Sequence, residues 1–454
     1  MGLLDLPSPE LVLGHPRNQA AQGLLADLIT NLRACETNQD GYEFQRELLA
    51  RRLDVEADRG RFKQAVTRIG SGKQPKADAP EPQSGLSATR LETWQLELEV
   101  CNRVIRQLRC VGDALAWRVF GFDRRHVIAR CRNQSPGLMG KNAGLGAEIE
   151  HVELAWRVDK KFALLHDLTN CLRIGDLTVF GDGGPKTIEI KTSLNAKAGK
   201  QNKRINEAEL AVLNLGPLPG GDGGERLHDL GMSFKTHLPL LADGMASAAS
   251  EGIFAAKVPG GRALVVADMH GVARRGWTGD EFADRIERRR ETVMRRSGLG
   301  AERGYIVAAR TVDSVATDPT RVPFAVYPLH PVMCARLIGD LAFFDVLTDG
   351  LVLADLLNEA GILAEWVRPP KTEALVPGEA LIRIKGQKRV PVRGTVVADL
   401  SRTLEVCRSE LDKYLIELVE KDTWFEGVRY LIGGRPLMPR RPWPYYKDEW
   451  RTWE

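Results

Sequence analysis

The stretch IGDLTVFGDGGPKTIEIKTS, residues 174–193, combines two strand-like runs with the charged side chains of a candidate site. In the second run, isoleucines alternate with Glu189 and Lys191, so at a period of two residues the carboxylate and the ammonium project from the same strand face. The glycine-rich residues 181–186 predict a hairpin that sets the two runs antiparallel and adjacent. We therefore expect Asp176, in the first run, to lie near Glu189.

Two carboxylates and a lysine that converge from neighbouring strands suit a divalent metal ion and an activated water. Hard oxygen ligands hold Mg²⁺, which polarises a phosphoryl oxygen and lowers the pKa of its bound water, while an ammonium orients the nucleophile. Asp176, Glu189 and Lys191 thus predict phosphodiester hydrolysis with Mg²⁺ as the cofactor and Mn²⁺ as a substitute. The alternative is a surface strand that carries an ordinary Glu/Lys pair.

A helix with acidic residues is predicted upstream, over residues 144–156. Its apolar residues recur at helical spacing, and Glu148 flanks the face that they form. Glu148 is therefore the predicted helix carboxylate. Glu150 points away from that face and is kept in reserve. The alternative is that the glutamates of this helix are a solvated face.

Basic residues follow the Glu-x-Lys strand. Lys197, Lys200 or Gln201, and Arg204 fall at helical spacing and form one basic ridge. Residues 186–204 contain six basic residues and one acid, Glu189. This local excess favours a polyphosphate substrate, whereas a plain solvated helix is the alternative.

Two further positions border the predicted site. His166 precedes the Asp176 strand and either modulates water or phosphate at the site edge or forms a structural hydrogen-bonded pair with Asp167. Lys141 lies in a glycine-containing loop, residues 137–142, that lacks the spacing of a phosphate-binding loop. It remains a candidate phosphate contact.

Taken together, these residues resemble the PD-(D/E)XK nuclease superfamily. Its core has a helix with an acidic residue, a strand with the motif Asp, a hairpin to the Glu-x-Lys strand and a following helix. The resemblance covers residues 136–215. It implies an α/β fold with a restriction-endonuclease-like mixed sheet core flanked by helices, and a metal-dependent nuclease activity.

The resemblance also implies roles for single residues. Asp176 and Glu189 would be metal ligands together with the helix carboxylate, and Lys191 the catalytic lysine. Gln201 is similar to a helix glutamine in some branches of the family. One departure is visible, because Gly175 stands where the family name has proline.

The composition of the chain excludes several classes of protein. The chain has 454 residues, 43 % hydrophobic and 27 % charged, which excludes wholesale disorder and collagen-like or coiled-coil composition. Its 64 basic and 60 acidic residues give a net charge of +4, so any nucleic-acid signal must be local. No apolar run is long enough for a membrane span, and the seven cysteines are scattered. We expect a cytoplasmic protein without a membrane partner and with reduced thiols.

Shifts in pattern predict five regions along the chain. They are a helical region at 1–69, a linker at 70–86, the nuclease-like core with its preceding helix at 87–220, an α/β extension at 221–320 and a C-terminal α/β region at 321–454. Outside the core, strands are predicted at 262–267, 304–312, 323–327, 381–385 and 389–397, and helices at 280–297 and about 401–420.

Two features of the flanks leave alternatives open. The arginine-rich helix at 280–297 either follows a nucleic-acid backbone or carries intrahelical ion pairs on a solvated face. The aromatic residues between 443 and 453 either stack on bases or dock on their own domain or on a partner subunit.

We therefore expect an enzyme, a Mg²⁺-dependent (endo)nuclease whose partner is nucleic acid. The preference for DNA over RNA, and a role in bacterial defence against phage or mobile DNA, come from the resemblance alone. One alternative is a non-catalytic nucleic-acid-binding or assembly protein that retains a nuclease-like fold. Another is a structural subunit that acts through the aromatic residues at 443–453 as a homo-oligomer or with a partner protein.

Overall fold

The chain folds into two compact units, each with its own helices and antiparallel sheet. The first contains residues 1–228 and 313–339, and the second residues 229–312 and 340–454. The fold class is therefore mixed α/β. The computed structural model describes residues 9–85, 91–131, 137–141, 144–190, 199–213, 215–219, 227, 235–300, 306–311, 320–367, 380–392 and 395–433.

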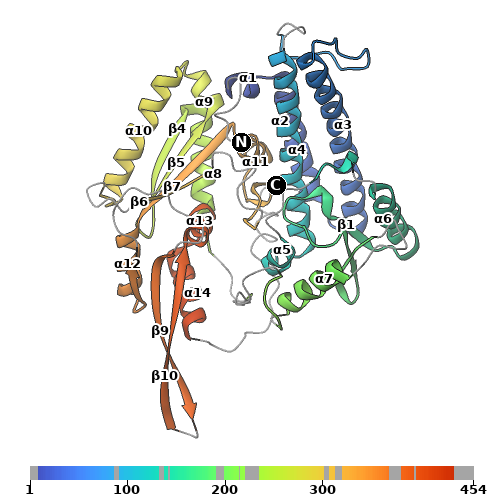
Figure 1. Ribbon diagram of the computed structural model, residues 1–454. Helices are drawn as coiled ribbons and strands as arrows, with labels where there is room; N and C mark the ends of the chain where they lie inside the picture. Colours follow the sequence, from blue (N-terminus) through green and yellow to red (C-terminus); the bar gives the residue numbers. More distant parts are fainter. Residues whose placement is uncertain are drawn as a thin grey trace. The chain divides into compact units, whose positions relative to one another are not determined.

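Long helices form one part of the first unit, and α2, α3 and α4 run side by side (Figure 1). The helices are α1 (Pro9–Leu13), α2 (Pro16–Ala34), α3 (Asn38–Gly70), α4 (Leu91–Val119) and α5 (Arg124–Arg130). A capping box of Thr37 and Asp40 begins α3. Because α3 packs against α4, the predicted linker at 70–86 joins two helices of the same unit rather than two units.

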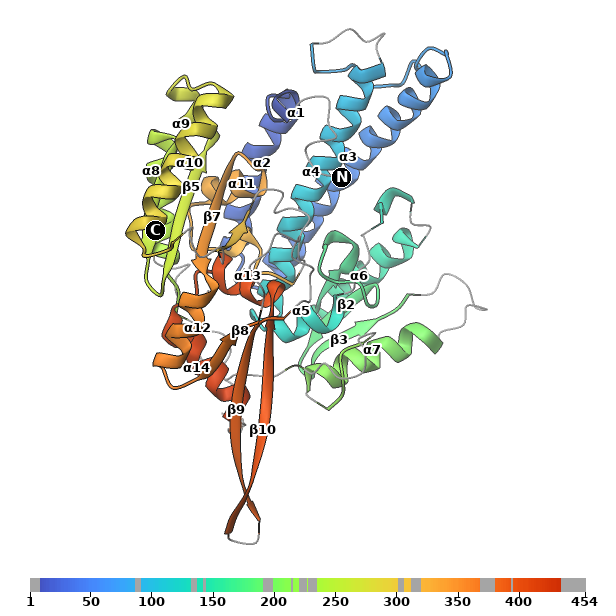
Figure 2. The same ribbon diagram turned by 60° about the vertical axis from the view of Figure 1, so that its left-hand side comes forward.

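A small sheet forms the other part of the first unit. Its elements are η2 (Met139–Lys141), α6 (Leu145–Asp159), β1 (Phe162–Leu165), η3 (His166–Leu168), β2 (Leu177–Gly181), β3 (Gly184–Ile188) and α7 (Gly199–Val212). β2 lies between β1 and β3 and is antiparallel to both, with Leu177 paired to Leu165 and to Ile188. α6 packs against β1 and β2, and α7 packs against β3 (Figure 2). The predicted hairpin is confirmed, but the described strands are purely antiparallel rather than mixed, because each strand pairs with the next one in sequence and runs back along it.

A segment late in the chain returns to the first unit. It contains η5 (Phe324–Val326) and α11 (Pro331–Ile338). The Arg33 guanidinium on α2 donates hydrogen bonds of 2.7 Å to the carbonyls of Tyr327 and Leu329. The predicted strand at 323–327 is therefore wrong: a single helical turn follows Pro323, and an arginine takes the carbonyls that a neighbouring strand would use.

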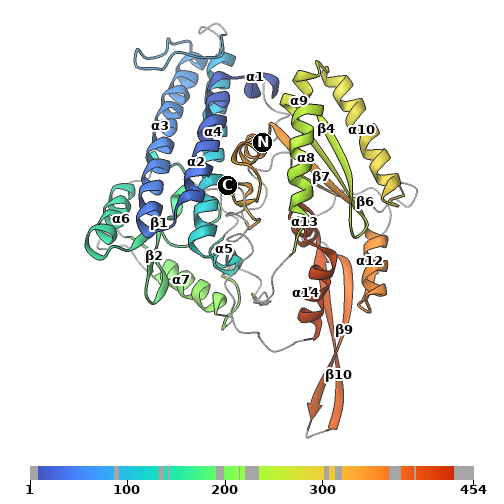
Figure 3. The same ribbon diagram turned by 180° about the vertical axis from the view of Figure 1, so that it is seen from behind.

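The second unit is built on a four-stranded antiparallel sheet of order β4-β5-β7-β6. The strands are β4 (Ile253–Val258), β5 (Arg262–Asp268), β6 (Ile306–Arg310) and β7 (Ala342–Asp349), and the first helices are α8 (Leu238–Glu251), α9 (Met269–Arg274) and α10 (Gly279–Arg296). α10 packs on the face that carries Val265, while Gly244 of α8 meets Val266. Because successive strand residues point to opposite faces, α8 and α10 cover the two faces of the sheet (Figure 3).

The rest of the second unit carries a long two-stranded ribbon. Its elements are α12 (Gly350–Glu359), β8 (Leu363–Trp366), β9 (Ala380–Val392), β10 (Thr395–Cys407), α13 (Arg408–Ile416) and α14 (Lys421–Gly433). β9 and β10 project beyond the other elements of this unit (Figures 1 and 3). The helix predicted at about 401–420 starts too early, because β10 continues to Cys407 before α13 begins.

Two predictions about the chain as a whole can be compared with the described residues. None of the described helices is long and apolar enough to cross a membrane. All seven cysteines lie in described segments, and none of them forms a disulfide.

Candidate active site

The turn before β2 depends on Gly175. Its φ is +74°, in the left-handed region that glycine enters without steric cost. A Cβ atom there would lie 2.5 Å from Cγ2 of Thr187 and 3.0 Å from the carbonyl oxygen of Ile188. Proline, which fixes φ at about −65°, would not fit this turn.

Asp176 and Glu189 lie at the same end of the β2–β3 ladder, beside the Leu177–Ile188 pair. The backbone N–H of Asp176 donates to the carbonyl of Ile188 at 2.9 Å. Oδ2 of Asp176 accepts a 2.7 Å hydrogen bond from the N–H of Ile190. Since these isoleucines are the two chain neighbours of Glu189, the bonds hold the acidic residues on facing strand ends, as the hairpin predicts.

The Asp176 carboxyl is half-buried, and its pKa is raised above the usual range for aspartate. Burial is the main cause, because it disfavours the charged form, and the negative charge of Asp167 adds to it. The hydrogen bond from Ile190 acts in the opposite direction. A cation beside this carboxyl would therefore relieve an electrostatic cost that the fold maintains.

The upstream helix places its glutamates differently. Glu148, in the first turn of α6, is buried, whereas Glu150 is exposed. Among the residues that the structure describes, no group of three or more His, Cys, Asp or Glu side chains could hold a metal ion. Glu148 therefore does not join Asp176 and Glu189 in one cluster of three carboxylates.

The two carboxylates at the end of the β2–β3 ladder fit Mg²⁺ by their chemistry. Mg²⁺ prefers oxygen ligands and is commonly held by one or two protein carboxylates, with water and substrate phosphate completing its coordination. Asp176 and Glu189 supply that set, and Oδ2 of Asp176 is oriented by the backbone of Ile190. Mn²⁺ accepts the same oxygen ligands.

His166 supports the turn that carries Asp176. Its backbone N–H donates to the carbonyl of Asp176 at 2.9 Å, and its Nδ1 lies 2.9 Å from the carbonyl oxygen of Gly175. Because a carbonyl only accepts, Nδ1 carries the proton and Nε2 accepts from the Thr178 hydroxyl at 2.8 Å. Burial, with the nearby charge of Arg130, lowers the pKa of His166 to about 3, so the ring is neutral. Both ring nitrogens are used, and Asp167 is not the partner of the ring.

The hydrogen bonds continue from His166 through the sheet to α5. Since Thr178 donates to His166, the Thr187 hydroxyl donates to Thr178 at 3.1 Å, and Nε of Arg130 donates to Thr187 at 2.8 Å. Arg130 is buried with its guanidinium 5.3 Å from the Phe120 ring centroid, and burial lowers its pKa to about 10. In this series of hydrogen bonds, each group donates to the next one, from the Arg130 guanidinium to the Gly175 carbonyl. One feature of the sequence indicates these hydrogen bonds: Thr178 and Thr187 occupy strand positions where a core strand would carry apolar residues.

A second group of buried charges, not identified from the sequence, holds the segment before β2. Arg52 on α3 is fully buried, with its Nε 3.0 Å from Glu56, and its Nη1 donates to the carbonyl of Asp167. Burial lowers the pKa of Arg109 on α4 to about 9, and the charges of Arg52 and Arg173 lower it further. These residues are far apart in sequence, so no local pattern could have revealed the group.

The basic ridge is only partly described. α7 begins at Gly199, with Lys200 exposed and Gln201 and Arg204 half-buried. Nη1 of Arg204 donates to Oε1 of Gln201 at 3.2 Å. Lys191 and Lys197 lie outside the described residues, as does the side chain of Lys141.

The first turns of α7 lie close to the Asp176 turn. Ile205 on α7 would lie 3.5 Å from a Cβ atom at Gly175. Ile174, Ile205 and Ala208 share a core cluster with Ala129 of α5. This core fixes the start of α7 beside the candidate site.

The arginine-rich helix α10 carries both local and tertiary contacts. Arg288 lies 3.9 Å from Asp284, and Arg290 pairs with Glu287 on the same helix and with buried Asp345 on β7. Arg285 lies 4.6 Å from the Trp277 ring centroid. These contacts agree with the ion-pair interpretation. The aromatic residues at 443–453 lie outside the described residues.

Comparisons of this chain with protein-family models, with curated proteins and with solved structures give no match. The candidate site therefore stands on its own residues and geometry.

Proposed function

We propose that the chain is a metal-dependent nuclease that hydrolyses phosphodiester bonds, with DNA as the favoured substrate. The observation that carries the proposal is the fixed position of Asp176 next to the neighbours of Glu189. The order of elements supports it, because a helix, an antiparallel three-stranded meander and a second helix follow one another as the resemblance implies. A restriction-endonuclease-like core is the finer fold assignment that we propose for residues 136–215.

In this proposal Asp176 and Glu189 hold Mg²⁺. The ion would supply a Lewis acid for a phosphoryl oxygen and activate a water for attack on phosphorus. Lys191, two residues beyond Glu189, orients that water and stabilises negative charge as it develops. Gly175 and His166 act as positioning residues, because they set the turn that carries Asp176.

The start of α7 is the proposed phosphate-binding element. Lys200, Gln201 and Arg204 lie in its first turns, where the helix dipole also favours an anion. The packing of Ile205 beside Gly175 keeps these turns close to the carboxylates. A scissile phosphate held there would lie between the basic ridge and the proposed metal.

One observation favours the second candidate, a non-catalytic nucleic-acid-binding protein with a nuclease-like fold. Glu148 is buried on α6 and does not complete a three-carboxylate cluster with Asp176 and Glu189. Against it, a pure binder gains nothing from two carboxylates beside a phosphate site, because their charge repels the ligand. Metal binding separates the two candidates.

The test compares Asp176→Asn with Asp182→Asn, which changes an exposed aspartate in the turn of the same hairpin. We expect Asp176→Asn to lose Mg²⁺ or Mn²⁺ binding in titration calorimetry and to reduce cleavage by about 10³-fold. Asp182→Asn should retain both. Metal binding that survives in Asp176→Asn, or cleavage at the wild-type rate, would overturn the proposal.

The same pair of variants has a stability readout. Because the pKa of Asp176 is raised in the folded state, its contribution to stability is present below the unfolded pKa and is lost as the pH rises through the folded pKa. Asp176→Asn should therefore raise stability at neutral pH by less than about 1 kcal/mol, allowing for partial exposure of the carboxyl. The gain should disappear near pH 3.

A further inference from the structure

The β9–β10 ribbon consists of a supported base and an unsupported distal half. β8 pairs with β9 only from Ile382 to Lys385. Beyond it, the two strands pair with each other alone, from Gly386↔Arg402 to Val392↔Thr395. At about 3.3 Å per residue, this distal half, residues 386–402, extends roughly 20 Å past the three-stranded base. It projects beyond the rest of the second unit (Figure 2).

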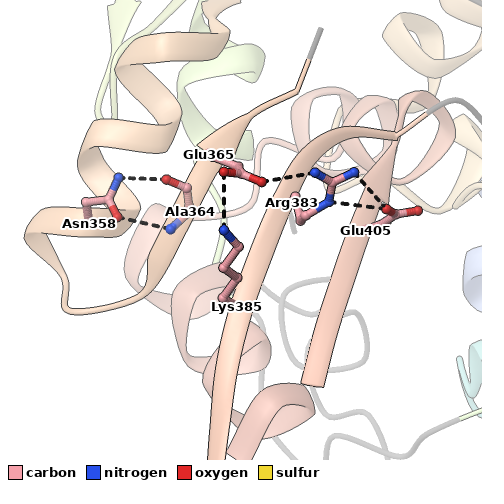
Figure 4. Close-up of polar contacts among 6 residues, drawn as sticks. All are labelled: Asn358, Ala364, Glu365, Arg383, Lys385 and Glu405. Atoms are coloured by element: carbon pink, nitrogen blue, oxygen red, sulfur yellow. Dashed lines mark hydrogen bonds and ion pairs between the residues drawn. The ribbon is translucent and has the colours of Figure 1, made fainter. Parts of the chain in front are cut away.

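Ion pairs neutralise the base of the ribbon. Arg383 on β9 lies between two carboxylates, with Nη1 3.0 Å from Glu365 on β8 and Nη2 3.4 Å from Glu405 on β10, and Lys385 lies 3.4 Å from Glu365 (Figure 4). These pairs join all three strands across one face. The charges of these two cations and two anions therefore cancel.

A hydrophobic face holds the same base in place. Ile382 and Ile384, on the face opposite Arg383, are fully buried, and α12 and α14 pack against β9. Nδ2 of Asn358, on α12, also donates to the carbonyl of Ala364 at 2.9 Å, and its Oδ1 accepts from the Ala364 N–H at 3.0 Å (Figure 4). The base is thus fixed to the body of the second unit, and the direction of the ribbon is set by that packing.

The distal half has an excess of positive charge. Its strand residues, 386–392 and 395–402, contain three basic residues, Lys388, Arg389 and Arg402, and one acidic residue, Asp399, so their net charge is +2. Asp399 is paired in register with Arg389, which leaves the excess on the other two positions. A chain with a total charge of only +4 thus concentrates cations on a projecting element.

We propose that the distal half of the β9–β10 ribbon is an arm that binds duplex DNA. A two-stranded β-ribbon fits the major groove of B-form DNA, which is about 12 Å wide, and the positive charge of its residues is complementary to the phosphates that border the groove. The A-form major groove of duplex RNA is too deep and narrow for such a ribbon. The arm therefore favours DNA, a distinction that the candidate active site does not make.

The charge of the arm argues against pairing between two copies of the chain. Two distal halves laid edge to edge would each bring the same positive excess, and like charges on facing strands are destabilising. DNA has the complementary charge. The inference deepens the proposed function, on which it rests, by assigning the substrate's binding element, but DNA binding can be measured without cleavage.

The test measures binding of a 30-base-pair fluorescent DNA duplex by anisotropy in EDTA, where no divalent metal is present. The arm variant replaces Lys388, Arg389 and Arg402 with glutamine. Its matched control replaces three exposed arginines of α10 in the same unit, Arg288, Arg289 and Arg296, with glutamine and so has the same net charge. We expect the arm variant to bind about 10-fold or more weakly and to reduce the slope of log K against log salt by roughly two, while the control stays within a few-fold of wild type.

Further measurements distinguish DNA binding by the arm from the alternatives. Lys388→Gln alone should lower the salt slope by about one, which keeps the test usable if the triple variant unfolds. Duplex RNA of the same sequence should bind at least about 10-fold more weakly than DNA. Wild-type binding by the arm variant, equal losses in the α10 control, or no DNA binding by wild type would overturn the inference. A change of mass in light scattering with unchanged DNA affinity would instead identify the arm as a contact between copies.

Failure of the arm proposal and failure of the proposed function give different results. DNA binding that depends on the arm, without cleavage in Mg²⁺, would support the arm as a DNA-binding element and contradict the nuclease proposal. Cleavage that depends on Asp176 but not on the arm would support the nuclease proposal and contradict the arm as the DNA-binding element.

Discussion

The β2–β3 hairpin and the β9–β10 ribbon are both antiparallel strand pairs, but opposite kinds of interaction hold them. In β2–β3, five-residue strands carry a buried hydrogen-bond chain from Arg130 through Thr187 to His166. In β9–β10, thirteen-residue strands are fixed at the base by partly exposed ion pairs around Arg383. The first arrangement fixes the position of a carboxylate, and the second supports a projecting basic element.

The two kinds of interaction contribute differently to the stability of the fold. A buried hydrogen-bond chain is costly to leave incomplete, because an unsatisfied buried group loses its hydration without compensation. A solvent-exposed ion pair contributes little to stability, since water and salt screen it. Perturbations of the β2–β3 site should therefore have large effects on stability, and perturbations of the ribbon base small ones.

The largest effect is expected at Gly175. Gly175→Ala places a methyl group in a left-handed conformation, 2.5 Å from the Thr187 side chain. It should lower the free energy of unfolding by about 4 kcal/mol or more, from backbone strain and overpacking together. Urea unfolding followed by tryptophan fluorescence measures the change.

Gly183, in the turn of the same hairpin, is the matched control. A Cβ atom there would meet no atom within 4 Å. Gly183→Ala should therefore change stability by less than about 0.5 kcal/mol. Equal effects at the two glycines would contradict the packing described for the Asp176 turn.

The next effect concerns pH and His166. Because the pKa of His166 falls from 6.5 in the unfolded chain to about 3 in the folded state, the unfolded chain binds the extra proton between these values. Its contribution is present above pH 6.5 and is lost as the pH falls towards 3, by roughly 4 kcal/mol. His166→Gln should flatten this part of the stability profile relative to wild type.

His151, exposed on α6, is the control for that measurement. His151→Gln should leave the shape of the profile unchanged. If His166→Gln and wild type lost stability in parallel between pH 6.5 and 3, the buried neutral state of the ring would be wrong.

The smallest effect is expected at the ribbon base. Glu405→Gln removes one of the two carboxylates that contact Arg383, whose side chain is 38 % exposed. The expected loss of stability is small, because water screens the exposed pair, and it should shrink further in 0.5 M salt. Thermal unfolding at low and high salt measures it, and a loss comparable to that at Gly175 would remove the contrast between the two hairpins.

Local pattern was sufficient to predict the β2–β3 hairpin. The alternation around Ile188 and the glycine-rich turn act within a few residues and indicate the hairpin, but its bounds differ from the prediction. The turn is shorter than residues 181–186, and β3 ends at Ile188, before Glu189. The helix of Glu148 and the helix after Lys191 follow from the same kind of local periodicity. The position of Asp176 beside the neighbours of Glu189 is a consequence of that register.

Long-range packing could not be predicted in the same way. No strand was predicted over the residues of β7, which only pairing with β5 and β6 identifies as a strand. The residues from Arg402 to Cys407 were assigned to a helix, although β9 supplies a partner that extends them as β10. The buried charges of Arg52 and Arg109 lie on α3 and α4, and their mutual effect depends on the packing of these two helices rather than on either local sequence.

The central claim is that Asp176, Glu189 and Lys191 form a metal-dependent phosphodiesterase site. The most direct test is cleavage of plasmid, linear duplex, single-stranded DNA and RNA in Mg²⁺ or Mn²⁺, with wild type beside Lys191→Ala and with metal binding measured on both. The account predicts cleavage of DNA by wild type alone, while Lys191→Ala remains folded and still binds the metal. Equal cleavage by the two proteins, or a wild-type protein that neither cleaves nor binds the metal, would contradict it.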